Sequence, residues 1–305
     1  MPLSPNLRGG LFMVAAAAGF TMNDAITKTV ASEMNFGQII LVRGLFAMVM
    51  VGALAYYRRA LRSPRTLLVL PVALRVFGEV GGTICFLTAI VHLPLANVSA
   101  IFQALPLAIT LGAVLVLREH VGWRRWLAIV VGFSGVLIVV RPGMAGFSGF
   151  SLFALLSVAF SAVRDLATRR IPAEIPTLFI TLLTTMTVTT AGAAVLFPLG
   201  GWRPMSAPSV GLLALAALLV MIGYQCVIIA MRTGDISAVA PFRYTALLWA
   251  MLLGYLVFGD VPDALMITGA SIIVVSGLYT FYREHQLGRK RPVAATSSGP
   301  PPDGL

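Results

Sequence analysis

Charged residues fall inside long apolar stretches of this sequence, where each is costly unless it is paired or has a function. Asp24, Arg43 and Glu79 lie in three such stretches, and Arg75 precedes Glu79 by one helical turn. At 1.5 Å per helical residue, Asp24 and Glu79 lie about 22 Å and about 20 Å from one membrane edge, and Arg43 enters from the opposite edge to about the same level. We expect Arg43 to pair with Glu79 or Asp24, with Arg75 competing for Glu79. Such pairs either hold helices together or bind substrate or a proton.

A second charged group, Arg164, Asp165 and Arg243, lies about 5 to 10 Å from the membrane edge assigned below to the cytoplasm. Arginines at this depth extend to the lipid headgroups, which is the ordinary structural interpretation of Arg164 and Asp165. Arg243 lies deeper, shortly after Pro241, and its counterpart in the internal repeat described below is an aromatic residue, Phe102. This asymmetry favours Arg243 as a binding residue.

Aromatic and polar residues accumulate on two stretches, 95–117 and 236–258, which we expect to form one wall of a binding site. Aromatic faces with a few polar groups suit a planar or amphipathic metabolite, although most membrane aromatics pack or anchor at the interface. The candidate substrate-binding residues are Glu79, Asn97, Phe102, Gln103, Arg243, Tyr244 and Trp249, and the candidate structural or coupling charges are Asp24, Arg43 and Arg75.

The stretch 66–91 is the candidate for the opposite wall, because small residues surround Glu79. Gly78, Gly81 and Gly82 allow a neighbouring backbone to approach closely, or leave space for a ligand. Prolines inside three stretches interrupt helices and free carbonyls that line a cavity; they are Pro71, Pro106 and Pro241.

The composition excludes an ordinary soluble domain. Of 305 residues, 58% are hydrophobic and 11% are charged, and the mean hydropathy is +0.93. The net charge of +11 sits between apolar runs rather than on a polar face, so it indicates membrane orientation and not nucleic-acid binding. The sequence contains no phosphate-binding loop, no metal-ligand spacing and no catalytic constellation. We expect no enzyme activity, no cofactor and no metal.

Ten apolar segments predict an all-α integral membrane protein of ten transmembrane helices. They cover residues 9–30, 36–57, 66–91, 95–117, 124–141, 149–168, 176–197, 208–231, 236–258 and 263–282. Residues 1–8 are expected to be a cytoplasmic N-terminus, and 283–305 a basic and then disordered cytoplasmic tail.

The basic residues predict the orientation in the membrane. With the N-terminus in the cytoplasm, Lys28, Arg141 and Arg203 fall on the outer side, whereas most of the 22 Lys and Arg residues fall on the cytoplasmic side. By the positive-inside rule, both termini face the cytoplasm of a bacterial-type inner membrane.

The chain also matches itself at an offset of about 141 residues. Glu119 falls on Asp260, and two further pairs of segments match: Asp24, Thr27 and Lys28 on Asp165, Thr168 and Arg169, and Gly82 and Cys85 on Gly223 and Cys226. A constant offset over separated segments indicates duplicated units, 9–141 and 149–282. Five spans per unit make these inverted-topology repeats, which typically bind substrate near the midplane where they meet.

Three segments of the first unit carry a family resemblance. They are PLANVSAI at 94–101, REHVGWRRWLA at 118–128 and GFSGVLIVVRPG at 132–143. These segments resemble the drug/metabolite transporter superfamily, in its EamA-type ten-helix branch, and RGLFA at 43–47 is similar to the Arg-x-x-x-Ala of that branch's second helix. In the second unit Asp260 stands where the branch usually has Glu.

The resemblance implies movement of small metabolites by alternating access, most often outward, and aromatic amino acid exporters are the leading hypothesis within it. Proton-coupled export of drugs or of another metabolite class is the alternative. Two other classes of protein are alternatives to a transporter: a membrane enzyme and a non-transporting membrane subunit. The expected partners are a small-molecule substrate and the lipid bilayer, with no nucleic acid and no obligatory protein partner.

Overall fold

The computed structural model describes residues 4–61, 69–117, 122–144, 146–172, 174–233 and 235–286, and every regular element in these ranges is a helix. The connector 118–121, with Glu119, and the tail from 287 onward lie outside them. The helices are α1 (Pro5–Val30), α2 (Phe36–Tyr57), α3 (Leu70–His92), α4 (Leu95–Phe102), α5 (Leu105–Leu117), α6 (Trp123–Val140), α7 (Phe150–Thr168), α8 (Thr177–Leu196), α9 (Ala207–Thr233), α10 (Ile236–Val239), the 3₁₀ helix η2 (Ala240–Tyr244), α11 (Thr245–Phe258) and α12 (Ala264–Gln286).

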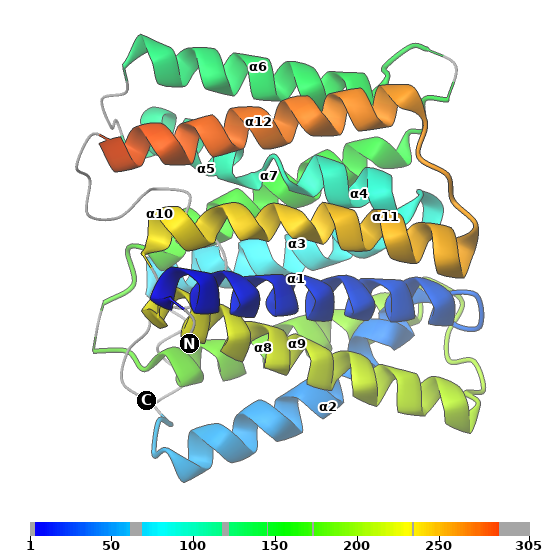
Figure 1. The fold of residues 1–305 in the computed structure, drawn as a ribbon. Coiled ribbons are helices and arrows are strands. Elements are labelled where there is room, and N and C mark those ends of the chain that lie inside the picture. Colours follow the sequence, from blue (N-terminus) through cyan, green and yellow to red (C-terminus); the bar gives the residue numbers. More distant parts are fainter. Residues whose placement is uncertain are drawn as a thin grey trace.

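The helices confirm the predicted ten-span, all-α membrane architecture. Among the described residues, nine helical segments are long and apolar enough to cross a membrane, counting Leu95–Val116 and Ala240–Phe258 as one each. The apolar part of α12, Ala264–Thr280, is the tenth and is shorter. Helix α1 begins, and α12 ends, at the same end of the bundle (Figure 1). The last helix continues to Gln286, four residues beyond the expected end.

Two of the predicted continuous spans are broken at corresponding positions of the two repeats. The fourth span ends as α4 at Phe102 and resumes as α5 at Leu105, whereas the ninth passes through η2 and becomes regular again at Thr245, 140 residues later. Pro106 and Pro241 explain the breaks, because a proline lacks the N–H that bonds the carbonyl four residues earlier. The prediction that prolines interrupt helices is therefore confirmed for Pro106 and Pro241. It is wrong for Pro71, which stands in the first turn of α3, where a proline needs no N–H partner.

The most extensive helix contacts join one repeat to the other. They are the pairs α1 with α9, α3 with α7, α2 with α8, and α6 with α12. Exchanging the two repeats turns the α1–α9 pair into the α7–α3 pair and leaves the other two pairs unchanged, as an internal two-fold symmetry requires. Helices α6 and α12 lie together at one edge of the bundle (Figure 1).

Glycines set the closeness of these pairs. A Cβ added at Gly78 of α3 would lie 2.7 Å from the Phe160 carbonyl oxygen and 2.8 Å from the Arg164 nitrogen on α7. A Cβ at Gly37 of α2 would lie 2.8 Å from the Leu196 nitrogen on α8. The small residues around Glu79 thus serve close backbone packing, which was one of the two predicted roles.

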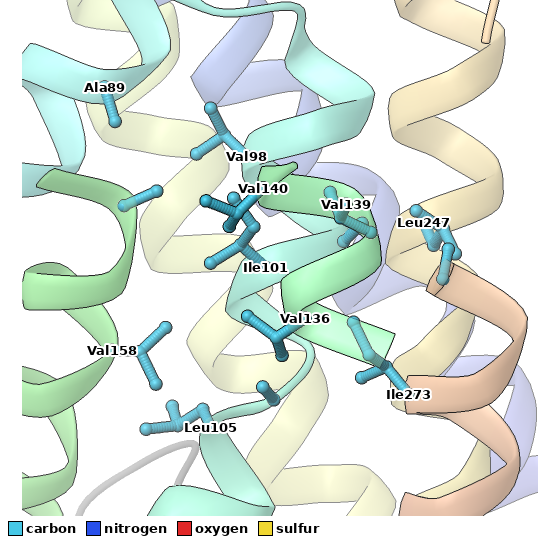
Figure 2. Close-up of a cluster of buried hydrophobic side chains, with 14 of the residues drawn as sticks. Ala89, Val98, Ile101, Leu105, Val136, Val139, Val140, Val158, Leu247 and Ile273 are labelled. Carbon is cyan, nitrogen blue, oxygen red and sulfur yellow. The ribbon is translucent and has the colours of Figure 1, made fainter. Parts of the chain in front are cut away.

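The apolar core surrounds the broken helix of the first repeat. Figure 2 shows Val98 and Ile101 of α4 and Leu105 of α5 beside α6, with α7, α11 and α12 contributing further side chains. Ile101 and Leu105 are each 1% exposed. The α4–α5 segment is therefore held mainly by packing, and the charged residues gather elsewhere, on α1, α2, α3, α7 and η2.

Candidate functional site

The centre of the candidate site is an ion pair between α3 and α7. Arg164 Nη1 donates to Glu79 Oε2 over 3.4 Å, and Arg164 Nε donates to Asp165 Oδ1 over 2.7 Å. The side chains of Glu79 and Arg164 are 21% and 16% exposed, whereas that of Asp165 is 5% exposed. One arginine therefore binds two carboxylates, and its link to Glu79 joins the two charged groups that the sequence suggested were separate.

Arg75 lies one helical turn before Glu79, nearer the start of α3. Its Nη1 donates to the Thr168 hydroxyl over 2.6 Å, and that hydroxyl donates to the Arg164 carbonyl over 2.6 Å. Arg75 interacts electrostatically with Glu79, as expected, but its hydrogen bond goes to Thr168. Within the described ranges, the Nε of Arg75 is buried without a hydrogen-bond partner, as is Asp165 Oδ2. The site thus holds unsatisfied polar atoms of both signs.

Asn23 lies between Arg43 and Asp24. Arg43 Nη1 donates to Asn23 Oδ1 over 2.9 Å, and Asn23 Nδ2 donates to Asp24 Oδ1 over 2.9 Å. The expectation that Arg43 pairs directly with Asp24 or Glu79 is wrong, because the Asn23 amide bridges Arg43 to Asp24 and Glu79 binds Arg164 instead. Arg43 still interacts electrostatically with Asp24 and Glu79.

Tyr224 of α9, which the sequence analysis did not select, lies among these charges. It interacts electrostatically with Glu79, Arg164, Arg75 and Asp165. Its ring packs edge-on against Phe20 of α1, with centroids 5.2 Å apart and planes at 72°. Tyr224 nevertheless remains 36% exposed. A signal was present in the sequence, since the flanking Gly223 and Cys226 match Gly82 and Cys85 of the third span.

Arg243 and Tyr244 of η2 lie near the charged residues of α7. Arg243 interacts electrostatically with Asp165 and Arg164, which places it with the group that the sequence predicted. Tyr244 is 7% exposed, and its hydroxyl occupies the place where a Cβ at Gly277 of α12 would stand. The irregular backbone of the ninth span thus places Arg243 near Asp165 and Arg164.

The other candidates on the fourth and ninth spans lie apart from these contacts. Phe102 packs edge-on against Phe86, with centroids 5.3 Å apart. Asn97, Gln103 and Trp249 are partly buried, and in the described structure none of them hydrogen-bonds to the charged residues. Their role in binding stays a prediction.

A different set of contacts closes the end of the bundle that we predict to be outer. Lys28 Nζ donates to the Leu93 carbonyl at the end of α3 and lies 5.1 Å from the Phe258 ring centroid at the end of α11. Lys28 also interacts electrostatically with Asp260, whose Oδ2 is buried and has no hydrogen-bond partner among the residues that the structure describes. Lys28 thus connects α1 and α3 of the first repeat to α11 of the second.

The loop before α12 carries an ion pair at this end. Arg141, at the end of α6, binds Asp263, whose Oδ1 also accepts from the Met266 N–H over 2.8 Å and so caps α12. The hydrogen bond from Arg141 and the helix N–H groups hold the pKa of Asp263 below its usual value of 3.8.

Comparison with known proteins gives a family. The model of the EamA-like transporter family matches residues 7–141 and 149–282. The chain belongs to the EamA-like transporter family. It is therefore a multi-pass membrane transporter of small metabolites and not an enzyme, as the sequence predicted.

Several characterised members resemble this EamA-like transporter over nearly the whole chain. A riboflavin transporter of Vibrio cholerae is 28% identical, covering 94% of this chain and 98% of that protein. An S-adenosylmethionine uptake transporter of Rickettsia prowazekii is 24% identical, covering 92% and 95%. A pseudopaline exporter of Pseudomonas aeruginosa is 26% identical, covering 88% and 94%.

A fold similar to that of this EamA-like transporter is known from experiment. A crystal structure that is 18% identical aligns with a TM-score of 0.62, covering 92% of this chain and 98% of that one. The cargoes named for the three relatives differ from one another, and none of the three names is that of an amino acid exporter.

Proposed function

We propose that this EamA-like transporter exports small zwitterionic metabolites, apolar or aromatic amino acids foremost, across a bacterial-type inner membrane, with both of its termini in the cytoplasm. The observation that carries the proposal is the charged site between the two repeats. Glu79 and Arg164 pair there while keeping 21% and 16% of their side chains exposed. A solute that carries an ammonium and a carboxylate complements both signs without leaving either side chain unpaired.

The geometry of the helices supports alternating access. Discontinuous helices at corresponding positions of inverted repeats are the usual surroundings of a midplane substrate site. In this chain the two breaks, at residues 103–104 and at η2, meet that description. Because each close helix pair contains one helix from each repeat, the bodies that move are made of paired helices and not of the separate repeats.

The names of two relatives support a solute that carries a ring system. S-adenosylmethionine and riboflavin, which name two of the relatives, each carry a heteroaromatic ring system, and S-adenosylmethionine is also an amino acid. The direction of transport differs among the relatives, since one is named for uptake and another for export. Export is proposed here from the branch that the sequence resembles.

Proton-coupled export of a cationic drug or another metabolite is the second candidate. One observation favours it: Asp24 lies within α1, and its hydrogen bond in the described structure comes from the neutral Asn23 amide rather than from Arg43 directly. A carboxylate that no cation contacts directly binds a proton more readily than one in an ion pair. In that mechanism Asp24 or Glu79 carries the proton.

Counterflow in liposomes containing only this chain tests the proposal. Vesicles are preloaded with single amino acids, nucleosides or cationic drugs, with and without a pH gradient. Glu79→Gln is compared with the parent and with Glu174→Gln, a control that removes an exposed carboxylate between α7 and α8. Normalised to folded protein, we expect exchange of aromatic amino acids that ignores the pH gradient, is unchanged in Glu174→Gln and is slowed in Glu79→Gln, which removes the negative charge that the substrate ammonium binds.

The opposite pattern would support the second candidate. Transport of a cationic drug that requires the proton gradient and is lost in Glu79→Gln, but not in Glu174→Gln, contradicts the amino acid proposal. It would make Glu79 the coupling carboxylate.

A further inference from the structure

Tyr224 is unusual in lying among charged residues from three other helices while keeping a large accessible surface. Its electrostatic partners are Glu79 and Arg75 of α3 and Arg164 of α7, and Arg43 of α2 also interacts with it. A side chain so placed faces the interior of the bundle and not the lipid. Its ring keeps 36% of its surface exposed beside these charged side chains.

The ring of Tyr224 is held in a defined orientation by α1. Phe20 meets it edge-on at 5.2 Å. Phe20 itself fits against Gly223, where an added Cβ would lie 2.9 Å from its Cε1 atom. The glycine beside Tyr224 thus seats the phenylalanine, and the two rings form a fixed aromatic surface next to the Glu79–Arg164 ion pair.

We infer that Tyr224 and Phe20 form the subsite that contacts the ring of an aromatic substrate, and that Tyr224 determines the preference for aromatic over aliphatic solutes. This inference rests on the proposed function and names the part of the site that selects the side chain. The neighbouring charges bind the ammonium and carboxylate that all amino acids share, so they do not distinguish one amino acid from another. An aromatic pair gains from a third ring by edge or offset contact, which an aliphatic side chain reproduces only in part.

The role of Tyr224 differs from that of its repeat counterpart, which is Thr83 at the offset of 141. The position of the third span that matches Tyr224 therefore carries no ring. A substrate that binds at the junction of the repeats meets the aromatic surface on the α1–α9 side and the paired charges on the α3–α7 side.

The test measures substrate preference and not activity alone. Exchange of phenylalanine and of leucine is compared in the parent, Tyr224→Phe and Tyr224→Leu, with Tyr255→Leu as the control at a tyrosine of α11 that is 61% exposed. We expect the phenylalanine-to-leucine ratio to fall about 2- to 10-fold in Tyr224→Leu, the range for losing one aromatic contact, and to stay unchanged in the other two variants.

The outcomes separate this inference from the function on which it rests. If the parent exchanges both amino acids and Tyr224→Leu keeps the parental ratio, or Tyr255→Leu changes it equally, the subsite is refuted and the transport proposal stands. If the parent exchanges neither amino acid, the proposed function fails, and thermal stabilisation by riboflavin decides the subsite. Stabilisation that Tyr224→Leu abolishes and Tyr224→Phe retains would support the ring contact, and any other result overturns it.

Discussion

Gly78→Ala places a single methyl group at the closest approach of α3 and α7. The new Cβ would lie 2.7 Å from the Phe160 carbonyl oxygen and 2.8 Å from the Arg164 nitrogen, and both neighbours are backbone atoms of a helix. Because a backbone cannot rotate away as a side chain does, the two helices must separate by several tenths of an ångström. This separation stretches the bond between Arg164 and Glu79, which is already 3.4 Å long.

Overpacking of this kind costs about 1 to 3 kcal/mol. For a chain of 305 residues, we expect the thermal midpoint of the purified protein in detergent to fall by about 2 to 6 °C. Gly211→Ala is the matched control, because Gly211 lies within α9 and a Cβ there meets nothing within 4 Å. There, alanine should stabilise the helix by about 0.5 to 1 kcal/mol.

Thermal unfolding and counterflow of the two alanine variants together test whether close glycine packing positions the ion pair. Gly78→Ala should lose stability and also slow exchange, since it displaces Arg164. Equal midpoints for Gly78→Ala and Gly211→Ala would show that α3 and α7 yield freely at this point. The reasoning that close glycine packing positions the ion pair would then be refuted.

Three further changes have definite expected results. Glu79→Gln should lower the free energy of unfolding by about 1.5 kcal/mol. This is the low end for a hydrogen bond to a charged group, because glutamine keeps an acceptor for Arg164. An unchanged thermal midpoint would contradict the pairing. Lys28→Asp and Asp260→Lys should each slow counterflow several-fold, because each change places like charges together. The double exchange should recover most of the rate. No recovery would show that the two residues act separately. Asp263 has a pKa below 3.8 in the folded protein, so its stabilisation is present above about pH 4 and disappears as the pH falls through the folded pKa. Asp263→Asn should therefore reduce the loss of thermal midpoint between pH 5 and pH 3, and an unaltered pH profile would contradict this role.

Much of the fold was predictable because a bilayer permits few backbone solutions. Each unbroken apolar segment of about 20 residues has to be a helix, and an odd number of spans per repeat has to invert the second copy. The breaks at residues 103–104 and at η2 follow from the prolines in kind, although not in position, because Pro106 lies after its break and Pro241 lies inside one. Pairing between the repeats depends on side-chain fit and did not follow from periodicity.

The charged site was predicted in its members but not in its partners. Helical depth placed Arg43 level with Glu79, yet depth says nothing about which face of each helix points inward. Asn23 bridges Arg43 to Asp24. Arg164 reaches Glu79 from α7 because the glycines on α3 bring α7 close. Tyr224 was missed because a single tyrosine in an apolar run is ordinary by composition.

The helix pairs that join the two repeats have a consequence for how the chain is made. While the ribosome has delivered only α1, α2 and α3, their most extensive partners, α9, α8 and α7, have not yet been synthesised. The glycine face of α3 must therefore lie against lipid until α7 arrives, and α1 waits longest of all for α9. Assembly in the membrane thus finishes late, so that a chain interrupted after its first half would hold five inserted helices without the contacts that fix their positions.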